Sequence, residues 1–126
     1  MVDFDKQVTH WCSGASEDWT VASELIERDR IRHGLFFAHL SLEKTLKGLI
    51  CKRTLELAPP IHNLVRLAQL ARVSLSEEKL DLLAEVNEFN IEGRYPEMRL
   101  PMPSQVEAQD YLSRIAEVLE WLKQQF

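Results

Sequence analysis

The sequence predicts an all-α fold, an up-down bundle of four longer helices and one short helix. Apolar residues recur every three or four positions through most of the chain, which is the spacing of one face of an α-helix. No segment alternates apolar and polar residues in the way that is typical of a half-buried strand. Glycine, proline and serine patterns that end or begin helices separate the periodic segments.

The first two helices are expected at residues 4–29 and 35–55. One face of the first carries Val8, Trp11, Ala15, Trp19, Ala22 and Ile26. The segment between them, 28–34, is basic and polar, and Gly34 is suited to a left-handed conformation after the first helix. One face of the second carries Leu35, Leu42, Leu46 and Leu49. Because the connection is short, the two helices should lie antiparallel.

The third helix is expected to be short, at residues 61–72, because Pro59 and Pro60 cannot continue the second. Its inward residues should be Leu64, Leu67, Ala68 and Ala71. Ser74 and Glu77 form a capping-box pattern before the fourth helix. That helix is expected at residues 76–90.

Residues 91–103 contain three of the five prolines and are expected to form a loop. The loop is long for so small a protein, which favours a role in binding. Ser104 and Glu107 repeat the capping-box pattern at the start of the final helix. One face of this helix carries Tyr111, Leu112, Ile115, Val118, Leu119 and Leu122.

The charge of the chain is unevenly distributed. The net charge is −5, which disfavours broad binding to nucleic acid. Residues 28–53, however, carry seven Lys or Arg against two acids, and their flanks, 1–27 and 73–93, each carry one Lys against six acids. The second helix is therefore a cationic strip between acidic ones. Complementary packing and solubility are the first explanation of this pattern, and the alternative is a local site for an anionic ligand or partner.

Composition places the protein in a broad class. A chain of 126 residues suits a single domain, 1–126, with a core that needs no metal or disulfide. Neither a membrane span nor a signal peptide is visible, so a cytoplasmic protein without a membrane partner is expected. Cys12 and Cys51 should then be thiols. The chain has no P-loop, no G-x-G-x-x-G, no G-x-S-x-G and no cysteine cluster, and no cofactor is expected.

The candidate ligand-binding residues are polar side chains on or near the second helix and in the loop after the fourth: His39, Glu43, Lys44, Lys47, His62, Arg94 and Tyr95. His39 and Glu43 are one turn apart, but no third ligand is evident, so no metal site is predicted. Glu43 and Lys47 are spaced as an ion pair, either exposed or part of a buried network with His62 and Arg94. Arg94 and Tyr95 offer a guanidinium group and an aromatic face to a phosphate or a protein.

Three motifs in series resemble the HEPN domain family. LSLEKTLKGLI (Leu40 to Ile50) is similar to the characteristic helix of the family, PPIHNL (Pro59 to Leu64) to the HDL-type start of its next helix, and Arg94-Tyr95-Pro96 to its segment after the fourth helix. The resemblance implies a HEPN-like helical bundle and a homodimer. It also implies a partner, a separately encoded minimal nucleotidyltransferase in a toxin-antitoxin-like pair, and a nucleotide or RNA as ligand.

The sequence departs from the ribonuclease members of that family. In those members an Arg is followed by four to six residues and a His, on a helix after the HDL-type segment. Here Arg28 with His33 and Arg32 with His39 have suitable spacings but lie too early in the chain, and no histidine follows His62. A non-catalytic binding protein is therefore expected. The alternatives are a ribonuclease toxin that uses one of the early pairs and a structural oligomeric adaptor.

Overall fold

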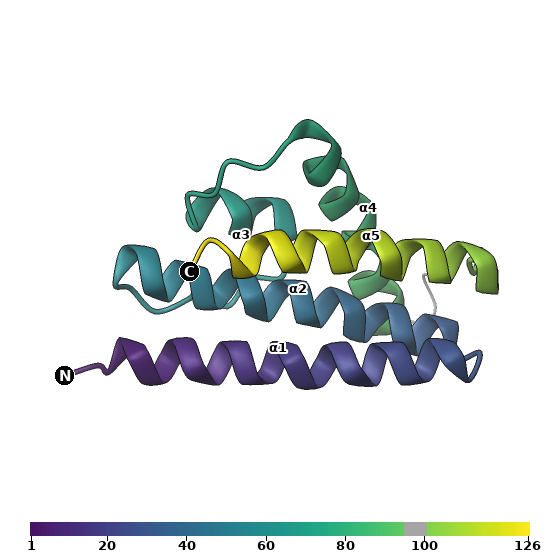
Figure 1. The fold of residues 1–126 in the computed structure, drawn as a ribbon, viewed down its shortest axis with the longest axis horizontal. Coiled ribbons are helices and arrows are strands. Elements are labelled where there is room, and N and C mark those ends of the chain that lie inside the picture. The colour runs from purple at the N-terminus through teal and green to yellow at the C-terminus, as the bar shows by residue number, and fades with distance from the viewer. Residues whose placement is uncertain (95–100) are drawn as a thin grey trace.

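The computed structural model describes residues 1–94 and 101–126, and the regular secondary structure in this part of the chain is entirely helical. The helices are α1 (Phe4–Glu27), α2 (Ile31–Thr54), α3 (Leu64–Leu70), α4 (Glu77–Arg94) and α5 (Gln105–Lys123) (Figure 1). The prediction of an all-α bundle with four longer helices and one short one is confirmed. Within the described residues, no helix is both long and apolar enough to cross a membrane.

Helix α2 is the centre of the fold. Figure 1 shows α1 running antiparallel along one side of it, with α5 and the α3–α4 pair on its other sides. It contacts each of the other four helices. Because it is surrounded in this way, α2 buries polar as well as apolar residues, including Ser41 and Thr45, whose hydroxyl groups donate to the carbonyl oxygens of Ala38 and Ser41.

The core consists of the apolar faces that the sequence predicts. The four leucines of the predicted α2 face, at positions 35, 42, 46 and 49, are buried, as are the four expected inward residues of the α3 segment. Helix α5 buries five of its six predicted stripe residues, and Tyr111 is half-buried against Phe89 of α4. In α1, by contrast, only three of the six predicted face residues are buried, namely Ala15, Ala22 and Ile26. Helical periodicity therefore predicts the buried positions of α2, the α3 segment and α5 better than those of α1.

The turn between α1 and α2 differs from the prediction. Helix α2 begins at Ile31, four residues earlier than expected, and Gly34 lies inside its first turn with no left-handed conformation. Asp29 takes the positive φ of 61° instead. Gly34 is required for close approach of the helices: a Cβ atom there would lie 2.5 Å from Cδ1 of Ile26 and 3.2 Å from the carbonyl oxygen of Ala22.

The starts and ends of the later helices were predicted less well. Helix α3 begins at Leu64 rather than 61, because Asn63 accepts a hydrogen bond from the backbone N–H of Arg66 as its N-cap. Ser76, not Ser74, accepts from a backbone N–H at the start of α4. That helix runs to Arg94, so the predicted loop 91–103 begins too early. The capping box of Ser104 and Glu107 is confirmed.

Candidate functional site

Four of the candidate residues meet in one place, which we call the polar cluster: His39, Glu43, Lys47 and His62. One carboxylate oxygen of Glu43 lies 3.0 Å from Nδ1 of His62, and the other lies 3.1 Å from Nζ of Lys47. Nε2 of His39 lies 3.1 Å from the backbone carbonyl oxygen of His62. Since a carbonyl only accepts, Nε2 carries the proton in this contact. The cluster therefore joins α2 to the loop before α3.

The polar cluster is mostly shielded from water. His39 is completely buried, and Glu43 and Lys47 are each 5% exposed. Nζ of Lys47 lies 5.3 Å from the centre of the Trp11 ring, so a cation–π contact with α1 covers the ammonium group. The side chain of His62, in contrast, is 44% exposed. A ligand or partner can reach the cluster at His62 without disturbing the buried charges.

The loop that carries His62 is held at both ends. Leu55, the C-cap of α2, takes a left-handed conformation with φ of 55°. Beyond His62, the side chain of Asn87 in α4 accepts a hydrogen bond from the backbone N–H of Leu64 at 2.9 Å and donates to Asn63 at 3.3 Å. These contacts place the imidazole of His62 against Glu43. Asn63 caps α3 through its side-chain oxygen, as an aspartate would, but it carries no charge.

Lys44 does not belong to the polar cluster. Its Nζ lies 2.8 Å from the carboxylate of Asp18 in α1, and its methylene groups pack beside Gly14. Residue 44 is rotated about 100° around the helix axis from residue 43, so the two side chains leave α2 in different directions. Lys44 is thus an α1–α2 contact outside the polar cluster, and its role in ligand binding stays a prediction.

The remaining candidates lie near or outside the described part of the chain. Arg94 is the last residue of α4, and its side chain is not described. Tyr95 falls in 95–100, outside the described residues. A role for either residue beside the polar cluster stays a prediction.

Sequence reasoning missed three residues that contact the candidate residues or the loop beside them. Trp11 was recognised only as a core residue, and Asn87 carries no local signal because its partners are more than twenty positions away. Asp18 had a weak signal, since the acidic first helix precedes a cationic one. In the described part of the chain, no group of three His, Cys, Asp or Glu side chains is arranged to hold a metal ion.

Comparison with known proteins places this fold. The family model described as HEPN domain matches residues 8–125. TT1696 from Thermus thermophilus has a similar structure, with a TM-score of 0.80 and 19% identity over 95% of this chain and 98% of that one. ST0689, an archaeal HEPN homologue, has a TM-score of 0.74 and 19% identity over 94% of this chain and 96% of its own. No curated protein sequence matches significantly.

The two structures establish similarity of fold alone, because their sequences differ so widely from this one. The family model adds sequence evidence over nearly the whole chain, including the polar cluster and the PPIHNL segment. Together with the helical architecture, it identifies the family. This chain belongs to the HEPN domain family.

Proposed function

We propose that this HEPN protein is a non-catalytic binding component, a homodimer that acts with a separately encoded minimal nucleotidyltransferase in a toxin-antitoxin-like pair. The partner, or a nucleotide that it shares, would contact the exposed edge of the polar cluster at His62. The partnership rests on membership of the HEPN family, and the observation that carries the non-catalytic role is the complete burial of His39, with its Nε2 bonded to the backbone of His62.

The burial of His39 argues against general acid–base chemistry at this position. RNA cleavage requires an imidazole that exchanges protons with the ribose hydroxyl or the leaving group, within hydrogen-bond reach. His39 has no contact with solvent, and Glu43 and Lys47 neutralise each other inside the fold. These three residues support the position of the loop, and His62 is the member of the cluster that a partner can touch.

Co-purification with the nucleotidyltransferase encoded by the neighbouring gene tests the proposal. The three exposed histidines, at positions 10, 33 and 62, allow matched variants. We expect His62→Gln to weaken the complex at least about tenfold, which is about 1.4 kcal/mol. His10→Gln on α1 should leave it unchanged. A neighbouring gene that encodes an unrelated protein, or equal binding by the two variants, would count against the proposal.

A nucleotide test addresses the ligand separately. A ligand that binds only the folded protein raises its melting temperature according to its concentration relative to Kd. We expect ATP with Mg²⁺ to raise the melting temperature of the wild-type protein and to have less effect on His62→Gln. If nucleotides change the melting temperature of neither protein, while the complex with the nucleotidyltransferase still forms, His62 contacts the protein partner alone.

The ribonuclease alternative retains one pair of residues. Arg28 and His33 are both exposed and flank the short turn between α1 and α2. An arginine can stabilise the charge of a phosphorane-like transition state while a histidine transfers protons. Cleavage of RNA by the purified protein, abolished by His33→Ala, would favour this alternative. An adaptor whose cluster is only structural predicts instead that His62→Gln and Glu43→Gln both leave partner binding intact.

A further inference from the structure

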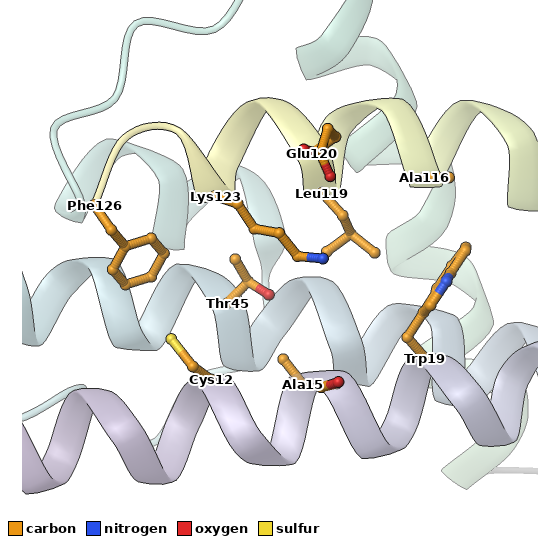
Figure 2. Close-up of a pocket in the computed structure, with 10 residues that line it drawn as sticks. Cys12, Ala15, Trp19, Thr45, Ala116, Leu119, Glu120, Lys123 and Phe126 are labelled. Carbon is orange, nitrogen blue, oxygen red and sulfur yellow. The ribbon is translucent and has the colours of Figure 1, made fainter.

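A cavity of about 390 Å³ lies between α1, α2 and α5, away from the polar cluster. Figure 2 shows it with Trp19 of α1 toward one end and Phe126, after α5, toward the other. The lining residues are Cys12, Ala15, Ser16, Trp19, Thr45, Ala116, Leu119, Glu120, Lys123 and Phe126. No member of the polar cluster is among them, so the cavity is a separate feature of the fold.

The walls of the cavity are largely hydrocarbon. Leu119, Trp19 and Phe126 supply large apolar surfaces, and two alanines keep the space between the helices open. The hydroxyl group of Thr45 already donates to the backbone of Ser41 and therefore adds little polarity. A space of this size and composition resembles the sites that proteins use for small organic molecules. Two turns of an α-helix occupy roughly 800 Å³, so the cavity suits a small molecule better than a helix of another protein.

Lys123 brings a positive charge to this apolar space. In Figure 2 its side chain leaves α5, and its nitrogen lies in the space between α5 and α2. Burial raises the pKa of the Cys12 thiol, and the Lys123 ammonium partly offsets this rise. Glu120 is the other charged residue at the rim, and Figure 2 shows its carboxylate against α5 itself rather than in the space between the helices. The charge that acts inside the cavity is therefore that of Lys123.

We propose that this cavity binds a small amphipathic carboxylate, with its hydrocarbon part between Trp19 and Phe126 and its carboxylate paired with Lys123. Burial of the hydrocarbon supplies most of the affinity, at roughly 25 cal/mol per Å² of apolar surface removed from water. The ammonium of Lys123 selects against neutral and cationic molecules of the same shape. The site does not depend on the proposed partnership at His62.

Three probes with the same ten-carbon chain test this selectivity: decanoate, decan-1-ol and decyltrimethylammonium. Each is titrated into the full-length protein, and binding is measured by calorimetry and by chemical shift changes of the Trp19 indole. We expect decanoate to bind about tenfold more tightly than decyltrimethylammonium. Equal affinity of the two charged probes, or no change at Trp19 with decanoate, would overturn the proposal.

Two variants separate the volume of the site from its charge. Ala116→Leu fills the cavity and should lower the affinity for decanoate and for decan-1-ol alike by about tenfold or more. Ala84→Leu, at an exposed position of α4, is the matched control. Lys123→Met keeps a long side chain without the charge, so it should weaken the binding of decanoate but not that of decan-1-ol. Its control, Lys52→Met on α2, should leave the binding of both probes unchanged. Wild-type affinity for decanoate in Lys123→Met would show that the charge is not used and would refute the assignment.

Discussion

Glu43 is a carboxylate held almost entirely away from water, with Lys47 and His62 as its partners. Removing a charge from water costs several kcal/mol, and only close pairing with further hydrogen bonds offsets that cost. The contacts of Glu43 with Lys47 and His62 supply this pairing, and the contact of His39 with the backbone of His62 helps to hold the loop before α3 against α2. The buried members of the polar cluster therefore have a structural role, and His62 is the member that a partner can contact.

We expect Glu43→Gln to lower the free energy of unfolding by about 1–3 kcal/mol, because the ammonium of Lys47 would remain buried without an opposite charge. Urea denaturation measures this change. The matched control is Asp110→Asn, which breaks an ion pair with Arg114 whose aspartate side chain is 64% exposed. The control substitution should lower the free energy of unfolding by less than about 0.5 kcal/mol. Equal effects of the two substitutions would mean that the buried pair contributes no more than a surface pair.

Glu107 gives the start of α5 a dependence on pH. Hydrogen bonds from the backbone N–H and the hydroxyl group of Ser104 lower the pKa of this carboxyl group. The unfolded chain therefore takes up the proton at higher pH than the folded one. The stabilisation is fully present above the ordinary Glu pKa of about 4.3 and is lost as pH falls through the lower folded value.

The corresponding prediction compares melting temperatures across this range of pH. Glu107→Gln should melt below the wild type at neutral pH, and the difference should shrink as the solution becomes acidic. Ser104→Ala should also lower the melting temperature, but its effect should persist at acidic pH, because the hydrogen bond that Ser104 Oγ accepts from the backbone N–H of Glu107 does not titrate. Ser113→Ala, at an exposed position of the same helix, serves as control. A difference in melting temperature between Glu107→Gln and the wild type that stays constant with pH would contradict this account.

Among the helices, the α1–α2 pair is the most closely packed. Gly34 permits the approach because its missing side chain leaves room for Ile26. Gly14, on the facing helix, has only the flexible side chain of Lys44 near the position of a Cβ atom, at 3.1 Å. The two glycines look alike in the sequence but lie in different surroundings.

Alanine substitutions should separate these two glycines. Gly34→Ala should lower the free energy of unfolding by about 1–3 kcal/mol, since the new methyl group must displace Ile26 or the backbone of Ala22. Gly14→Ala should be neutral or should stabilise by up to about 1 kcal/mol, because alanine is the better helix former and Lys44 can move. Chemical denaturation of both variants checks the prediction, and the opposite order of stability would refute it.

Taken as a whole, the molecule joins the ends of three helices through one arginine. The guanidinium group of Arg53, near the end of α2, donates to the carbonyl oxygen of Arg72 at 2.9 Å and to that of Gln125 at 3.2 Å. Arg72 follows α3 with a positive φ of 58°, and Gln125 follows α5. These two segments are distant in sequence, so the contact closes one end of the bundle.

Replacement of Arg53 should loosen this end without unfolding the core. Arg53→Met should speed amide hydrogen exchange in the segments around Arg72 and Gln125, while the amides of the central turns of α2 keep their protection. Lys52→Met, at the exposed neighbouring position, should leave both segments unchanged. Uniformly faster exchange throughout the molecule would show that Arg53 contributes to global stability instead.

Local pattern was sufficient to predict the helices, their apolar faces and the pairing of Glu43 with Lys47. Each of these depends on residues within about one turn, for which helical geometry gives the relative position. The proposed inclusion of His62 in the network was also correct, although it came from the resemblance to the family rather than from spacing. The HEPN assignment followed from the same motifs and is confirmed.

Contacts between helices required the folded molecule. Lys44 binds Asp18, Lys47 lies over Trp11 and Asn87 holds Leu64, and none of these pairs is close in sequence. Each depends on the rotation of one helix against another, and a shift of one residue turns a side chain by about 100°. That rotation depends on the packing of the whole core, so neither these contacts between helices nor the cavity beside Lys123 could be predicted from the sequence.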